Sequence, residues 1–246
     1  MEDRIFGTNP VFEALSSGRE IDKIFILEGA RHSRLAQITS LAKKRGIHYT
    51  MVNRKKLDEL SEGGNHQGVL AFAAVHSYSS LEDILDLAAK KGEPPFVLIA
   101  EGLKDPHNLG SIIRCANAAG AHGVVIPKNR SVGLNSTVAK VSAGAVEYTP
   151  VARVTNIGAA IDKLKEKGVW VAGTALEGST FHTEADLTGA LAIVIGSEGE
   201  GLSRLVREKC DFLVKIPILG QAESLNVSVA AGILLYEAVR QRQAKK

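Results

Sequence analysis

The chain has 246 residues, of which 45% are apolar and 23% charged, and its formal net charge is +3. This composition is typical of a globular protein with one large domain or two smaller ones. The start, MEDRIFGTNPVFEAL, lacks the basic and apolar regions of a signal peptide, and no apolar run approaches the roughly 20 residues that cross a bilayer. Cys115 and Cys210 stand far apart, with no partner at metal-ligand spacing. We therefore expect a cytoplasmic protein with reduced thiols and no bound metal.

Residues 1–75 predict a small α/β unit. Helices are expected over 9–18, 33–46 and 55–64, and strands over 21–29, 47–53 and 68–75. Within this unit, residues 29–57 contain eight lysines and arginines and no acidic residue. Such a basic block suits the phosphate backbone of a nucleic acid, although a solvated basic face explains it equally well.

Residues 76–95 are expected to link this unit to the rest of the chain. Ser80 can cap a short amphipathic helix there, and Gly92-Glu93-Pro94-Pro95 would end it. Beyond residue 95, near-continuous apolar strands alternate with helices, which predicts a parallel sheet covered on both faces. The expected strands are 96–102, 123–127, 148–154, 169–176, 191–198 and 212–218, and the expected helices are 108–120, 135–145, 157–168, 201–210 and 227–243. Ligands bind at the carboxyl ends of the strands in such sheets.

Three of these strand ends carry unusual polar residues. The first lies in DPHNLGSIIRCANAAG, where Asn108 is well placed to cap the following helix. Arg114 lies in the same segment, among small and apolar residues and with few acidic neighbours. An arginine in such surroundings commonly faces a phosphate or a carboxylate.

The second strand end is IVIGSEGEGLS, in which Gly196, Gly199 and Gly201 could let the backbone approach a ligand closely. The glycine spacing matches neither the dinucleotide-binding GxGxxG pattern nor a P-loop. Tight structural turns also use glycine, so the glycines alone are weak evidence. Glu198 between them has no obvious use in a purely structural turn.

The third strand end is IPILGQAESLNVSV, a tight turn between two apolar segments. A plain connection needs a glycine and one capping residue. This turn instead places a carboxylate, a hydroxyl and an amide within four positions, at Glu223, Ser224 and Asn226. We therefore expect it to contribute functional side chains.

Taken in this order, DPHNLGSIIRCANAAG, IVIGSEGEGLS and IPILGQAESLNVSVAAGILLYEA resemble the three signature motifs of the SpoU (TrmH-like) RNA 2'-O-ribose methyltransferases, a family of the SPOUT class. The resemblance covers roughly residues 96–242. IFGTNPVFEAL and NHQGVLAFAA are similar to the RNA-binding extension of the bacterial rRNA branch of the family. The resemblance implies an N-terminal α/β (L30e-like) RNA-binding domain over 1–75, a linker over 76–95, and an α/β trefoil-knot (SPOUT) catalytic domain with a parallel sheet over 96–246.

The resemblance also implies the cofactor, S-adenosylmethionine (S-adenosyl-L-methionine), held in the knot. The implied cofactor contacts are Gly196, Ile216, Leu225, Leu176 and Gly220. The implied catalytic residues are Arg114, which would clamp phosphate and activate the ribose hydroxyl, and Asn108, Glu198, Ser224 and Asn226, which would position the reacting groups. The basic block would supply RNA contacts from Arg31, Arg34, Lys43, Lys44 and Arg45.

The implied partners are RNA and a second copy of the chain, because the family forms homodimers near its last helix. The branch resemblance favours a guanosine in large-subunit rRNA, but family members that modify tRNA share the same motifs. A catalytically silent RNA-binding protein of this fold is a rival hypothesis, which broken motifs would favour. A nucleotide-dependent oxidoreductase is another, which the missing GxGxxG pattern disfavours.

Overall fold

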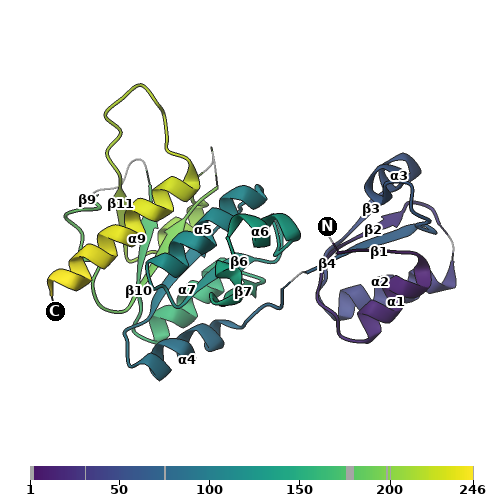
Figure 1. Ribbon diagram of the computed structural model, residues 1–246, viewed down its shortest axis with the longest axis horizontal. Helices are drawn as coiled ribbons and strands as arrows, with labels where there is room; N and C mark the ends of the chain where they lie inside the picture. The colour runs from purple at the N-terminus through teal and green to yellow at the C-terminus, as the bar shows by residue number, and fades with distance from the viewer. Residues whose placement is uncertain are drawn as a thin grey trace. The chain divides into compact units, whose positions relative to one another are not determined.

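The computed structural model of the protein is shown in Figure 1. It describes residues 3–30, 32–74, 76–175, 180–197, 199 and 201–245. Three of the predicted site residues, Arg31, Leu176 and Glu198, lie outside the described residues. The chain forms two compact units, which we call the N-terminal unit (1–77 with 133–136) and the C-terminal unit (78–132 with 137–246). None of the described helices is both long and apolar enough to cross a membrane.

The N-terminal unit is a mixed sheet covered by helices. Its elements are β1 (Asp3–Phe6), α1 (Thr8–Ser16), β2 (Ile21–Leu27), α2 (Ser33–Lys44), β3 (Tyr49–Val52), α3 (Arg54–Ser61) and β4 (Val69–Ala73). The strand order is β1-β4-β2-β3, with β4 antiparallel to both neighbours and β2 parallel to β3. Leu15, Ile24 and Ile38 belong to the core that α1 and α2 form with the sheet. The sequence pattern missed β1, a short edge strand.

The C-terminal unit is a parallel α/β structure. Its elements are α4 (Leu81–Lys91), β5 (Phe96–Ala100), α5 (Pro106–Ala118), β6 (Gly123–Pro127), α6 (Ser136–Val141), η1 (Ala145–Glu147), β7 (Val151–Val154), α7 (Ile157–Glu166), β8 (Trp170–Thr174), β9 (Thr180–Phe181), β10 (Leu191–Ile195), α8 (Arg204–Lys209), β11 (Phe212–Lys215) and α9 (Val227–Ala244). Its strands form a seven-stranded sheet, and all the pairings are parallel. The prediction of a parallel sheet is confirmed.

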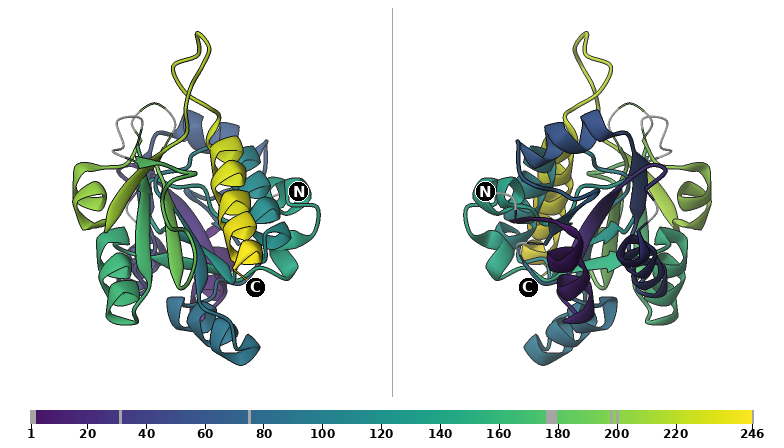
Figure 2. Two further views of the ribbon diagram at one scale, coloured as in Figure 1. Left: turned by 90° about the vertical axis from the view of Figure 1, so that its left-hand side faces the viewer. Right: turned by 90° about the vertical axis from the view of Figure 1, so that its right-hand side faces the viewer.

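The strand order β7-β6-β5-β10-β8-β11-β9 reverses direction between β5 and β10. The chain runs outward from β5 through β6 to β7, then crosses to build the other side of the sheet from β8. Every residue of β5 and β10 is buried, because helices cover both faces of these central strands. Figure 2 shows α5 and α9 on one face of the sheet and α7 and α8 on the other. The reversal places a crevice at the carboxyl ends of the two central strands.

Residues 76–95, expected to form a linker, contain a helix that packs into the C-terminal unit. Ser80 caps α4 in a capping box with Asp83, as the sequence suggested. Leu81 and Ile84 are buried in the core of this unit. The Cβ that a larger residue would add at Gly123 would lie 2.5 Å from the side chain of Ile84, so the helix sits close against the start of β6. An amphipathic helix buries its apolar face on the nearest sheet, and α4 does so here.

The last helix, α9, lies against α5. Ala231 is fully buried, and a Cβ at Gly232 would lie 3.7 Å from the Cys115 Sγ. The small residues near the start of α9 therefore serve, at least in part, the packing of two helices within one chain. Residues 216–226, between β11 and α9, form a loop that stands out from the sheet (Figures 1 and 2). Leu219 in this loop is 95% exposed.

Candidate active site

Two cavities open at the carboxyl-terminal edge of the parallel sheet. The first, which we call the β8–β11 cavity, measures about 250 Å3 and lies among the ends of β8, β10 and β11 and the start of α9. The second, the β5–β7 cavity, measures about 930 Å3 and lies beyond the ends of β5, β6, β7 and β10. Ser197 and Gly201 line both cavities. The turn that follows β10 therefore forms a wall between them.

The β8–β11 cavity unites residues from the second and third motifs. Gly196, Ile216, Ser224 and Leu225 line it, all four of them predicted site residues. Gly220, a predicted cofactor contact, is not among its lining residues. The other lining residues are Thr174, Ala175, Ile195, Ser197, Gly199, Gly201, Val214, Ile218, Glu223, Val227, Ala230 and Leu234. The wall is mostly apolar, with a few polar groups.

Gly196 is buried where β10 ends and the chain folds back over it. Ser197 and Gly201 exchange two backbone hydrogen bonds of 3.1 and 3.0 Å, which close the turn. A Cβ atom at position 196 would overlap the carbonyl of Gly201 and the amide of Leu202. Gly199 and Gly201 have φ angles of +86° and +65°, which side chains disfavour. The turn itself needs these glycines, whatever ligand it faces.

The first and third motifs meet through two asparagines that are 118 positions apart. Nδ2 of Asn226 donates a hydrogen bond of 3.0 Å to Oδ1 of Asn108. Oδ1 of Asn226 accepts from the amide and the hydroxyl of Ser228, at 2.9 and 2.6 Å. Because these donors fix the orientation of the Asn226 amide, its NH2 group must point toward Asn108. The pair joins the first turns of α5 and α9.

The prediction that Asn108 caps α5 is wrong. The cap is Asp105, whose carboxylate accepts from the His107 amide at 2.9 Å, and Pro106 occupies the start of the helix. An Asp-Pro pair is a strong helix start, because the missing N–H of proline has no partner at that position anyway. Asn108 instead lies in the first turn, only 7% exposed, and lines the β5–β7 cavity.

Arg114 lies on the exposed side of α5. It makes no hydrogen bond or ion pair with any residue of the part of the chain that the structure describes. It lines neither cavity. Asn108, Ser224 and Asn226 therefore gather at the sheet edge in a single chain, whereas Arg114 does not join the wall of either cavity.

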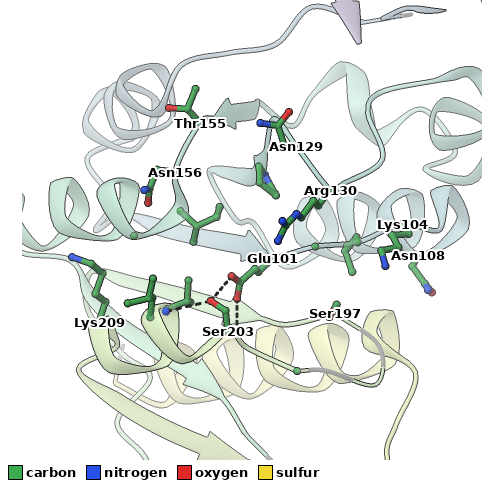
Figure 3. A pocket seen from close by; sticks show the side chains of 18 of the residues that line it. Glu101, Lys104, Asn108, Asn129, Arg130, Thr155, Asn156, Ser197, Ser203 and Lys209 are labelled. Atoms are coloured by element: carbon green, nitrogen blue, oxygen red, sulfur yellow. Dashed lines mark hydrogen bonds between the residues drawn. The ribbon is translucent and has the colours of Figure 1, made fainter. Parts of the chain in front are cut away.

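Glu101 is a site residue that the sequence pattern did not reveal. It follows β5 and lines the β5–β7 cavity. Its amide donates to the Ile195 carbonyl at 2.9 Å, and its carboxylate accepts from the amide and hydroxyl of Ser203, at 3.0 and 2.7 Å (Figure 3). These bonds tie the end of β5 to the turn after β10. An acidic residue directly after five buried apolar residues, in FVLIAEG, is the signal that could have indicated it.

Arg45, in the predicted basic block, has a structural role in the N-terminal unit. Its guanidinium donates to the carbonyl oxygens of Leu15, Gly18 and Arg19 at 2.8, 3.0 and 3.0 Å. These carbonyls lie at the end of α1, where a helix leaves its last acceptors unpaired. Arg45 therefore fastens the end of α1 to the end of α2.

The other described members of the block differ among themselves. The guanidinium of Arg34 lies 4.3 Å from the ring centroid of Phe12 and donates to Gln37 at 3.0 Å. Lys43 and Lys44 are exposed in the last turn of α2 and make no ion pair with the described residues. These two lysines, and Lys55, which is likewise exposed and makes no ion pair with the described residues, remain available for phosphate.

The β8–β11 cavity suits a nucleoside that carries a short charged chain. Ile216, Leu225 and Leu234 offer apolar surface for a purine ring. Glu223 and Ser224 provide a carboxylate and a hydroxyl near the same wall, which suit an ammonium group. These residues fit S-adenosylmethionine.

The described residues give little support for chemistry by a bound metal, a reactive thiol or a catalytic histidine. No group of three His, Cys, Asp or Glu side chains in that part of the chain could hold a metal ion. Burial raises the pKa of Cys210 to about 11, so its thiol stays protonated and donates to the Val206 carbonyl at 3.2 Å. His122 is buried, and desolvation lowers its pKa despite a 3.1 Å hydrogen bond from its Nε2 to Glu93. Both groups serve the structure.

Two family models match the chain. The SpoU rRNA methylase family matches residues 95–236, and the RNA 2'-O ribose methyltransferase substrate-binding family matches residues 4–79. A Bacillus subtilis protein named as a TrmH family tRNA/rRNA methyltransferase is 50% identical over 240 residues, which cover 98% of this chain and 96% of that protein.

Solved structures agree with these matches. The SpoU methyltransferase AviRb of Streptomyces viridochromogenes, in complex with AdoMet, is 27% identical, with a TM-score of 0.63 over 99% of this chain and 91% of its own. An AdoMet-bound rRNA methyltransferase of Sinorhizobium meliloti is 29% identical, with a TM-score of 0.60 over 96% and 86%. A TrmH/SpoU tRNA modifying enzyme of A. aeolicus is 29% identical, with a TM-score of 0.57 over 67% and 82%. The chain thus belongs to the SpoU (TrmH-like) family of RNA 2'-O-ribose methyltransferases, enzymes with the SPOUT fold that use S-adenosylmethionine.

Proposed function

We propose that the protein methylates the 2'-hydroxyl of a guanosine in large-subunit rRNA. The observation that carries this proposal is the extent of the structural similarities. The neighbour described as an rRNA methyltransferase covers 96% of the chain, N-terminal unit included, whereas the tRNA modifying enzyme covers 67%. The N-terminal unit matches a substrate-binding family, so similarity there bears on the choice of RNA. The motifs IFGTNPVFEAL and NHQGVLAFAA support guanosine through the branch that they resemble.

The residues at the sheet edge have distinct proposed roles. S-adenosylmethionine, when bound, supplies an electrophilic methyl group. Gly196, Ile216 and Leu225 hold the cofactor in the β8–β11 cavity. The hydrogen-bonded pair of Asn108 and Asn226 fixes the wall against which the ribose lies. Holding the hydroxyl in line with the methyl group can remove several kcal/mol of the barrier, about the scale of well-oriented intramolecular reactions.

Arg114 is the proposed activating residue. An arginine guanidinium stays protonated in proteins, so Arg114 acts by clamping a substrate phosphate and stabilising the hydroxyl oxygen, whose proton leaves to the clamped phosphate or to water. Arg114 lines neither cavity of its own chain. We therefore propose a homodimer in which Arg114 of one copy completes the site of the other. Exposed Val229 and Tyr236, two turns apart on α9 and 50% and 52% exposed, offer apolar surface for that contact.

The reaction is proposed to need no metal and to take place in the cytoplasm. Asn108, Asn226 and Ser224 supply neutral hydrogen-bonding groups, and Arg114 supplies the positive charge that a metal would otherwise bring. Full transfer in excess chelator is the expected result. Activity that depends on an added divalent cation would contradict this part of the proposal.

The decisive test is a map of 2'-O-methyl groups in rRNA and tRNA from a bacterial strain that lacks the gene. One methyl group should be missing from a guanosine of large-subunit rRNA, and purified protein with S-adenosylmethionine should restore it on RNA from that strain. If a tRNA methyl group is lost and restored instead, the substrate of the enzyme is tRNA. No missing methyl group in either RNA would refute the proposal.

A further inference from the structure

The β5–β7 cavity is larger than the β8–β11 cavity and lies directly beside it. Ser197 and Gly201 line both. Asn108 lines the β5–β7 cavity and accepts the hydrogen bond of Asn226, whose neighbours Leu225 and Val227 line the β8–β11 cavity. A ligand in the larger cavity would therefore adjoin the cofactor cavity at Ser197 and Gly201, the residues that the two cavities share.

The charges around this cavity are of two kinds. Lys104, after β5, and Arg130, after β6, are exposed and make no hydrogen bond or ion pair with the residues that the structure describes. The acidic groups are already occupied, since Glu101 accepts twice from Ser203 and Asp105 caps α5. Figure 3 shows the Arg130 side chain extending toward Glu101. The uncommitted charges are positive, which suits phosphate.

The rest of the wall combines apolar side chains, such as Leu103, Ile157 and Leu205, with amide and hydroxyl groups. Asn129 follows β6, and Thr155 and Asn156 follow β7 (Figure 3). Oδ1 of Asn156 accepts from the Ala159 amide at 3.0 Å, so its NH2 group is left to face outward as a donor. Groups of this kind recognise the hydrogen-bonding edge of an unstacked RNA base. A volume of about 930 Å3 accommodates a base together with a phosphate.

We infer that the β5–β7 cavity is the subsite for the nucleotide that is methylated. Its base lies toward Asn129 and Asn156, a flanking phosphate lies between Lys104 and Arg130, and its ribose lies at the Asn108 wall. This inference rests on the proposed methylation of RNA. It assigns base selection to the ends of β6 and β7, outside the three signature motifs and outside the basic block of the N-terminal unit.

The test uses the full-length protein with two variants, Lys104→Gln and Arg130→Asn. Asparagine suits position 130 because Arg130 has a φ of +58°, a conformation that asparagine tolerates. The matched control is Lys167→Gln, an exposed lysine at the far end of α7 that lines neither cavity. The probes are the four nucleoside 3',5'-bisphosphates, titrated in the presence of S-adenosylhomocysteine.

The wild type and the control should bind one bisphosphate in preference to the other three. Each variant should bind it at least about 10-fold more weakly, the loss expected for one charge-assisted hydrogen bond. The affinity for S-adenosylhomocysteine should not change, because Lys104 and Arg130 do not line the cofactor cavity. Asn129→Ala should reduce the preference among the four bases more than the overall affinity.

Transfer to RNA separates this inference from the proposed function. With total RNA from the strain lacking the gene, both variants should raise KM, and the control should not. Transfer by the wild type with an unchanged KM for both variants would overturn the subsite while leaving the proposed function intact. No transfer to any RNA by the wild type would instead refute the proposed function.

Discussion

The N-terminal and C-terminal units use their distinctive polar residues in different ways. In the N-terminal unit, a run of cations dense enough to suggest RNA binding includes Arg45, whose guanidinium is occupied by three backbone carbonyls. In the C-terminal unit, Asn108 and Asn226 come from distant segments and meet in one hydrogen bond. A charge run on a helix is a local feature with many uses. Polar residues at the ends of parallel strands converge, because all those ends lie at one edge of the sheet.

The largest expected effect on activity comes from substitution of Arg114 in the C-terminal unit. Arg114→Ala should fold and bind cofactor normally, because the side chain is exposed and makes no hydrogen bond with the described residues. Its single-turnover rate should fall about 10²–10⁴-fold, the usual value of an activating group. Arg114→Lys should rescue it poorly, since an ammonium cannot reproduce the planar fork of the guanidinium. An Arg114→Ala enzyme that transfers methyl at the wild-type rate would exclude Arg114 from the reaction.

Mixed dimers test whether Arg114 acts in the site of its own chain or in the site of the partner. A mixture of Arg114→Ala and Asn226→Ala proteins should recover part of the activity that each lacks alone. Recovery is expected only if Arg114 of one copy serves the site that contains Asn226 of the other. A mixture as inactive as its components, with dimers present by mass measurement, would place Arg114 in the site of its own chain.

The glycine after β10 should be nearly intolerant of substitution. Gly196→Val should lower the free energy of unfolding by about 1–3 kcal/mol or more and abolish cofactor binding, because its Cβ would overlap the backbone at Gly201. The matched control is Gly220→Ala, since a Cβ there meets nothing within 4 Å and the residue lines neither cavity. Calorimetric titration with S-adenosylmethionine and thermal unfolding measure both effects. Normal binding by Gly196→Val would show that the turn can relax.

Substitutions of Asn226 should have a stability effect that depends on whether the cap of α9 is kept. Asn226→Ala removes the cap of α9 and the hydrogen bond to Asn108, and should cost about 1–2 kcal/mol. Asn226→Ser can keep the cap but loses the amide donor, so it should be the more stable variant. A double-mutant cycle with Asn108→Ala measures the coupling of the pair by chemical denaturation. A coupling energy of zero would mean that the two side chains act independently.

In the N-terminal unit, substitutions of neighbouring cations should affect different properties, stability in one case and RNA binding in the other. Arg45→Ala should lower the free energy of unfolding by about 1–2 kcal/mol, because three carbonyls lose their donor. Lys43→Ala with Lys44→Ala should leave stability unchanged and reduce the salt dependence of RNA binding by about one unit per lysine. Unfolding curves and binding titrations at several salt concentrations distinguish the two. An unchanged salt dependence of RNA binding in the double variant would mean that the two lysines form a solvated face and do not contact RNA phosphates.

The smallest expected effect concerns acid stability of the C-terminal unit. Arg240 and Gln241 donate to the buried carboxylate of Glu237, and the bond from Arg240 in particular lowers its pKa from 4.5 to about 2. A lowered pKa in the folded state stabilises the fold above pH 4.5, and this stabilisation is lost as pH falls from there toward 2. Glu237→Gln should therefore flatten the pH dependence of unfolding in that range. An unchanged slope would mean that other carboxylates dominate it.

Much of the C-terminal unit could be predicted from the sequence. The runs FVLIA and LAIVI are apolar at every position, which is typical of a strand that is buried on both faces of a sheet. They form the central strands β5 and β10. The strands that escaped prediction were β1 and β9, of four and two residues. Strands so short pass through too few alternations to give a periodic signal. The packing of α4 was also not evident, because an amphipathic face does not say which unit will cover it.

The residues of the candidate site could likewise be predicted only in part. The motifs indicated Gly196, Ile216, Ser224 and Leu225, and all four line one cavity. They did not indicate Glu101, whose partner Ser203 is 102 positions away. A carboxylate after a strand has many possible partners, and only the pairing of β5 with β10 brings this one into reach.

The sequence by itself determined the family, the parallel sheet and the strand ends with unusual polar residues, because these depend on local composition and on motifs that are contiguous in the chain. Only the tertiary structure decided which polar groups meet. It paired Asn108 with Asn226, made Arg45 a structural residue and left Arg114 outside both cavities. The physical reason is that strand order sets the distances between residues more than 100 positions apart, and strand order follows from how apolar faces are buried together rather than from any local pattern.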